Sequence, residues 1–192
     1  MHYDIFISYR RNGGYETAKH LYDLLTRDGY SVSFDIDTLR NGDFDKSLFK
    51  RIEQCNDFIL IVDKHAFDRS LDSSFDRKKD WLRCELAYAL ELKKNIIPIL
   101  LAGVDGFPEN LPSDIVAVSM KNGPRHDMYY FDSFYKKLCK DFLLSSNNGS
   151  KYDFRDLLQD NDVPIGLEDW NNTCRHSKFI DFLKKIFREK QV

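Results

Sequence analysis

The chain has 192 residues, of which 42% are hydrophobic and 31% charged, and its 29 basic and 31 acidic side chains give a formal net charge of -2. This length suits one domain with a short appendage, and this balance is typical of a soluble globular protein and argues against disorder. The near-neutral charge also argues against a broad electrostatic grip on nucleic acid or on an anionic membrane, so we expect neither as a partner.

Strand-like and helix-like segments alternate along the first 144 residues. We expect strands over residues 3–9, 30–35, 58–62, 95–101 and 115–119. We expect helices over residues 16–28, from Asp43 onward, over 81–94 and over 129–144. Gly29 is a suitable stop for the first helix, Asp43 and Asp80 are suitable N-caps, and Pro98 favours an edge position for its strand.

Strands that alternate with helices predict an α/β fold with a parallel sheet. We therefore expect a flavodoxin-like sheet of about five strands with helices on both faces. Ligands of such sheets bind beyond the carboxyl ends of the strands, which directs the search for a site to the residues that follow each strand.

A Ser/Asn/Gly-rich stretch at residues 145–150 predicts a linker. Beyond it, residues 151–192 form an extension whose last part carries an apolar stripe at helical spacing, made of Phe179, Phe182, Leu183, Ile186 and Phe187. We expect this extension to be helical and to pack on the preceding domain or on a neighbouring subunit. Nothing in it has catalytic spacing.

Several common kinds of site and segment have no signature in the sequence. It holds no G-x-G-x-x-G, no P-loop and no G-x-S-x-G motif, and its five histidines lack metal-ligand spacing, so no metal is expected. The longest apolar run, residues 96–102, is too short to span a membrane, and the first residues do not resemble a signal peptide. The four cysteines form no C-x-x-C pair and are expected to be reduced, as in a cytoplasmic protein.

Polar and aromatic side chains follow the predicted strands. Arg10 and Arg11 come after the first strand, and Trp81 and Glu85 open the helix after the third. A separation of four places Trp81 and Glu85 on one helix face. Spacing alone still favours a structural explanation, with Glu85 on a solvated flank and Trp81 as a core anchor, because surface carboxylates greatly outnumber catalytic ones.

At these residues the sequence resembles the TIR (Toll/interleukin-1 receptor) domain family. The resemblance rests on D-I-F-I-S-Y-R-R at residues 4–11, V-S-F-D-I-D-T-L-R-N-G-D-F at 32–44, D-W-L-R-C-E at 80–85 and K-N-I-I-P-I at 94–99, all in the family's order. It covers about residues 1–144 and is strongest toward the catalytic branch, found in bacterial antiphage proteins and in an animal axon-degeneration NADase, and weaker toward the receptor adaptors.

The resemblance implies that the chain cleaves NAD+ between nicotinamide and ribose, with Glu85 as the catalytic carboxylate. NAD+ is then the substrate, and no cofactor is expected. By the same resemblance Trp81, Arg10, Arg11, Tyr9 and Ser8 line the substrate pocket, although a buried structural hydroxyl is the better expectation for Ser8. For either arginine an ion pair with Asp35 or Asp37 is nearly as good an explanation.

The loop from Asp37 to Asp45 corresponds to the mobile BB loop of the family. The resemblance assigns Asp37, Arg40 and Gly42 to self-association through TIR–TIR contacts. It assigns Phe44 to stacking on a nucleobase, and a core contact at the start of a helix explains Phe44 equally well.

The implied products are nicotinamide and ADP-ribose, or a cyclised or conjugated ADP-ribose that signals to a separate effector in bacterial antiphage immunity. Two alternatives stay open. A non-enzymatic TIR adaptor needs neither Glu85 nor Trp81, and a nucleoside deoxyribosyltransferase-like enzyme has no diphosphate for Arg10 and Arg11 to bind.

Overall fold

The computed structural model describes residues 2–34 and 44–145. Its centre is a parallel sheet whose strands lie in the order β2-β1-β3-β4. The strands are β1 (Ile5–Ser8), β2 (Val32–Ser33), β3 (Asp57–Val62) and β4 (Asn95–Leu100). The helices are α1 (Arg11–Arg27), α2 (Phe44–Gln54), α3 (Asp68–Leu71), α4 (Trp81–Glu91) and α5 (Phe131–Lys137). The predicted α/β class and parallel sheet are confirmed.

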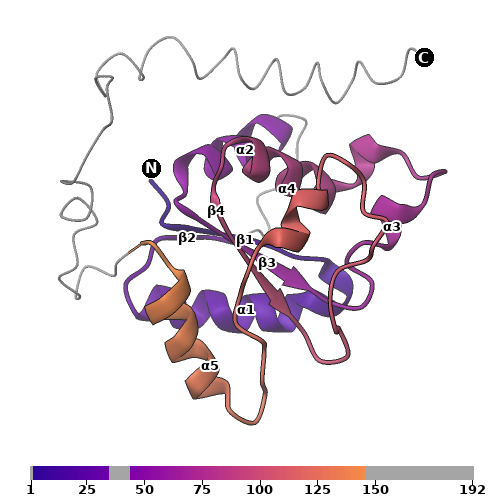
Figure 1. Ribbon diagram of the computed structural model, residues 1–192. Helices are drawn as coiled ribbons and strands as arrows, with labels where there is room; N and C mark the ends of the chain where they lie inside the picture. Colours follow the sequence, from indigo (N-terminus) through magenta and orange to yellow (C-terminus); the bar gives the residue numbers. More distant parts are fainter. Residues whose placement is uncertain (1, 35–43, 146–192) are drawn as a thin grey trace, which may run out of the picture. The chain divides into compact units, whose positions relative to one another are not determined.

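Helices cover both faces of the sheet, with α1 and α5 on one side and α2 and α4 on the other (Figure 1). Side chains alternate between faces along a strand. Ile5 and Ile7 of β1 therefore join the core that α1 and α5 complete, while Phe6 points to the opposite face and stacks on Phe58 at 5.4 Å between ring centroids. The same alternation turns Ser8 toward the face that α4 covers.

The predicted end of the first helix is confirmed, whereas its start at Arg11 lies before the expected residue 16. Gly29 has a φ of 94° and donates its N–H to the carbonyl of Thr26, so it stops α1 as expected. At the other end, Gly13 has a φ of 105°, and a Cβ atom there would lie 3.0 Å from Cγ of Asp63. The regular part of α1 begins after this glycine, which lets the chain pass close to the end of β3.

The predicted fifth strand at residues 115–119 is wrong. Residues Val116–Met120 form a 3-10 helix, η2, and the buried residues Ile115 and Val118 are three apart, which fits a 3-10 helix and not a strand. Among the described residues, the sheet has four strands.

The outer edge of β4 is closed by the segment that leads to α5. Pro98 lies in this edge strand, as predicted. Gly123 packs so closely on it that an added Cβ would come within 1.9 Å of the Pro98 carbonyl oxygen, and His126 donates its backbone N–H to Leu100. Only a glycine fits against the strand at this position.

The last described residues are held at the amino ends of the strands. Asp57, fully buried at the start of β3, accepts hydrogen bonds from the backbone N–H groups of Leu144 and Ser145 and from the amide of Asn95. A π-helical turn, η3 (Leu138–Phe142), and a 3-10 turn, η1 (Arg77–Lys79), complete the described elements. Within the described ranges, we find no helix with the length and apolar character needed to cross a membrane. The predicted linker and extension lie almost wholly outside the described residues.

Candidate active site

The carboxyl ends of β1 and β3 and the first turn of α4 surround a pocket of about 760 Å³. Five of the residues singled out in the sequence line it: Tyr9, Arg10, Arg11, Trp81 and Glu85. The pocket therefore lies where ligands of parallel sheets usually bind.

Glu85 reaches the pocket because of how α4 begins. Asp80 caps the helix by accepting a hydrogen bond from the backbone N–H of Arg83, so Trp81 is the first helical residue and Glu85 lies one turn further on the same face. Ser8 donates a hydrogen bond of 2.6 Å to one carboxylate oxygen of Glu85. Ser8 is only 1% exposed, so the expected buried hydroxyl is found, and it holds the carboxylate from beneath.

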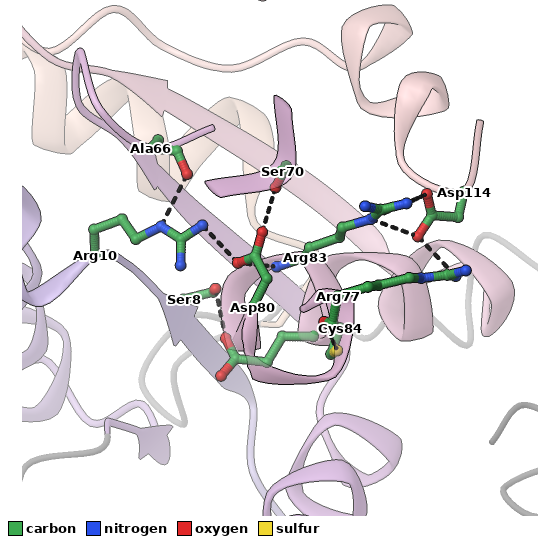
Figure 2. Close-up of polar contacts among 10 residues, drawn as sticks. Ser8, Arg10, Ala66, Ser70, Arg77, Asp80, Arg83, Cys84 and Asp114 are labelled. Atoms are coloured by element: carbon green, nitrogen blue, oxygen red, sulfur yellow. Dashed lines mark hydrogen bonds and ion pairs between the residues drawn. The ribbon is translucent and has the colours of Figure 1, made fainter. Parts of the chain in front are cut away.

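Asp80 also anchors Arg10. The Arg10 guanidinium forms an ion pair of 2.6 Å with the Asp80 carboxylate and donates a second hydrogen bond of 2.9 Å to the carbonyl oxygen of Ala66 (Figure 2). Ser70 donates to the other Asp80 oxygen at 2.6 Å. Arg10 thus joins the end of β1, the turn after β3 and the start of α4.

The two consecutive arginines have different surroundings. Arg10 is largely buried, and its guanidinium is committed to Asp80, which the sequence did not suggest as a partner. Arg11 is exposed and lines the pocket. Of the pair, Arg11 is therefore better placed to meet an anionic ligand from solvent.

A second ion-pair cluster stabilises the loop after β4 against α4. Asp114 accepts three hydrogen bonds from Arg83, at 2.7, 3.0 and 3.2 Å, and pairs with Arg77 at 2.9 Å (Figure 2). Arg77, the first member of the basic run at residues 77–79, is therefore held by this carboxylate.

Cys84 adjoins Glu85 in sequence but has a different environment. Its side chain is buried, and burial, together with the nearby carboxylates of Asp80 and Glu85, raises the pKa of the thiol to about 12. The sulfur is therefore a neutral thiol at neutral pH and not a nucleophile.

Sequence reasoning missed part of the pocket wall. The turn after β3 and helix α3 contribute His65, Asp68 and Arg69. A signal for them existed, because any residues that directly follow a central parallel strand belong to the same edge of the sheet as Arg10 and Arg11.

The BB-loop residues Asp37, Arg40 and Gly42 lie outside the described residues, as do Asp35 and the Phe44 side chain. Their assignments stay predictions.

Comparison with known proteins agrees with the fold and with the sequence resemblance. The family model described as "TIR domain" matches residues 5–139. The chain is 38% identical over 140 residues to "NAD(+) hydrolase tir-1" of Caenorhabditis elegans and 32% identical over 137 residues to "NAD(+) hydrolase SARM1" of Danio rerio. Each match covers 71% of this chain but only 14% and 19% of those proteins, so the chain spans less than a fifth of either relative.

Among solved structures, the TIR domain of the Toll-related receptor TRR-2 from Hydra magnipapillata aligns with a TM-score of 0.52 at 21% identity. The alignment covers 73% of this chain and 98% of that domain. This similarity supports the fold and does not bear on chemistry.

Proposed function

The chain belongs to the TIR domain family, and from that premise we propose that it cleaves NAD+ at the bond between nicotinamide and ribose. The observation that carries the proposal is the arrangement of Glu85 and Trp81, one helical turn apart on the wall of a single pocket with Arg11. The two animal relatives described above are named NAD(+) hydrolases, which supports the same chemistry.

The chemistry needs only one carboxylate. Nicotinamide in NAD+ is a pyridinium and leaves as a neutral base, so no acid has to protonate the leaving group, unlike in most glycosidases. Positive charge develops on the ribose as the bond breaks, and a fixed carboxylate stabilises it. Glu85, held by Ser8, fits this role.

The neighbouring residues suit the remaining parts of the substrate. The Trp81 ring offers a π-face to the nicotinamide, with cation–π attraction while that ring is charged. The Arg11 guanidinium suits a diphosphate oxygen. Because Arg10 is paired with Asp80, we assign it to positioning α4 and the turn after β3, and not to the diphosphate.

Four further properties that the sequence resemblance implies are also proposals. They comprise cyclised or conjugated ADP-ribose as product, TIR–TIR self-association, a separate effector and a role in bacterial antiphage signalling. The last of these rests on the sequence motifs, since both relatives reported above are animal proteins.

The test is incubation of the concentrated protein with NAD+, with nicotinamide and all adenine-containing products separated by chromatography. Glu85→Gln keeps the size of the side chain but removes its charge, and we expect nicotinamide release to fall at least about 100-fold. Glu91→Gln, which neutralises an exposed carboxylate at the other end of α4, is the matched control and should retain full activity.

Equal turnover by Glu85→Gln and the unaltered protein would contradict the role of Glu85. No turnover at any protein concentration would favour the adaptor, and exchange of bases between deoxynucleosides would favour the transferase.

A further inference from the structure

The pocket wall contains a histidine, His65, that has no role in the cleavage step proposed above. His65 follows β3 and lines the same pocket as Trp81 and Glu85. Its Nδ1 atom is 2.8 Å from a carboxylate oxygen of Asp68, which also lines the pocket. Because an ionised carboxylate only accepts hydrogen bonds, the neutral imidazole carries its proton on Nδ1, and the lone pair on Nε2 stays available as a base.

The backbone that carries His65 is fixed from two sides. The backbone N–H of His65 donates to Asp63 at 2.7 Å, and the next residue, Ala66, accepts the hydrogen bond from Arg10. Through Arg10 this turn is tied to Asp80, which caps the helix that carries Glu85. The Arg10 guanidinium therefore fixes the turn that carries His65 relative to α4, the helix that carries Glu85.

We propose that His65, oriented by Asp68, accepts the proton of the hydroxyl compound that captures the ribosyl centre. The inference rests on the proposed NAD+ cleavage and extends it to the second half of the reaction. As the bond between C1′ and the nicotinamide nitrogen breaks, its electron pair stays on that nitrogen. The acceptor oxygen forms a bond to C1′, and the acceptor proton passes to Nε2 of His65 and then to solvent.

This role predicts which acceptors depend on His65. Water and alcohols must lose a proton when they bond to C1′, so they benefit from a base. A free pyridine attacks through its ring nitrogen and becomes a pyridinium without losing a proton, so it needs no base. Glu85 stabilises the ribosyl centre in both reactions, whereas His65 serves only the first.

The experiment measures how the 192-residue chain divides NAD+ between these two outcomes. The protein is incubated with NAD+ and 3-acetylpyridine, and ADP-ribose and the exchanged dinucleotide are quantified by chromatography. General bases typically contribute 10²- to 10⁴-fold, so we expect His65→Gln to lower the ratio of hydrolysis to exchange by about 100-fold, with exchange itself unchanged. Asp68→Asn should lower the ratio in the same direction and less strongly.

Lys64→Gln is the matched control, because it alters an exposed side chain of the same turn that does not line the pocket, and the ratio should not change. Melting temperatures check that each variant is folded. A His65→Gln variant that loses hydrolysis and exchange equally, or that keeps the original ratio, overturns the inference while the proposed function stands. Absence of nicotinamide release by the unaltered protein overturns both.

Discussion

Ser8 at the end of β1 and Glu85 in α4 are 77 positions apart in the sequence and are joined by a hydrogen bond of 2.6 Å. The bond forms because strand alternation turns Ser8 toward the face that α4 covers, and because the cap at Asp80 places Glu85 one turn into that helix. The buried Ser8 hydroxyl, by donating this hydrogen bond, fixes the position and the orientation of the Glu85 carboxylate.

We expect Ser8→Ala to lower kcat for nicotinamide release by about 10-fold or more, because a hydrogen bond to a charged group is worth about 1.5–3 kcal/mol. The measurement is initial rates at saturating NAD+, with the melting temperature recorded in parallel. Ser119→Ala, which removes an exposed hydroxyl, is the control. Unchanged kcat in Ser8→Ala would show that Glu85 does not need this donor.

The two arginines after β1 should respond differently to the same substitution. In Arg10→Gln, the Asp80 side chain, which is 1% exposed, loses its charged partner, and breaking such a pair costs about 3–5 kcal/mol. We expect a clearly lowered free energy of unfolding in urea. Arg11→Gln should keep the stability and raise KM for NAD+ about 10-fold, as the loss of one charge-assisted hydrogen bond implies. If both variants lose equal stability, the division of roles is wrong.

Asp57 should be among the most sensitive positions for stability. Asp57→Ala removes the acceptor for two backbone N–H groups and one side-chain amide, and each buried donor left unsatisfied costs about 1–3 kcal/mol. We expect a loss of at least about 2 kcal/mol in urea unfolding. Asp141→Ala removes an exposed carboxylate and serves as the control, with little expected effect.

Because His126 is partly buried, we expect the folded protein to lose stability in mild acid. Its ring packs against Phe131 and Phe134, and burial lowers the pKa of the imidazole, with nearby His20 acting in the same direction and Asp127 opposing it. Between this lowered pKa and the ordinary value near 6.5, the unfolded chain binds more protons than the folded one, so stability rises with pH.

Melting temperatures between pH 7.5 and pH 5.5 test this expectation. His126→Gln should show a smaller fall in melting temperature toward pH 5.5 than the unaltered protein, whereas His2→Gln should show the same fall. An identical fall in His126→Gln and the unaltered protein would contradict it.

Much of the architecture was readable from local pattern. The continuous apolar run in β3, the stop at Gly29 and the cap at Asp80 are each determined by residues close together in sequence, and all three are confirmed. The error at residues 115–119 has a physical origin, because a short apolar stretch fits a strand or a 3-10 turn equally well until the buried positions are known.

The site was readable only in part, because its partnerships are long-range. Trp81 and Glu85 line one pocket with the residues at the end of β1, as parallel topology leads one to expect. The choice of Asp80 as the partner of Arg10 depends on how the start of α4 packs against β1, which no spacing encodes. His65 was not predicted as a site residue, because it lies in a polar stretch without a recognisable motif.

The closed edge of β4 restricts how this domain can assemble. Proteins often join by adding a strand to an open sheet edge, where unpaired backbone groups await a partner. In β4, Pro98 has no N–H that could donate a hydrogen bond, and Gly123 packs against its carbonyl oxygen. The carbonyl oxygen of Leu100 already accepts a hydrogen bond from the backbone N–H of His126. A strand of another molecule therefore cannot pair with β4 over residues 98–100, and assembly through this part of the domain has to use side-chain surfaces.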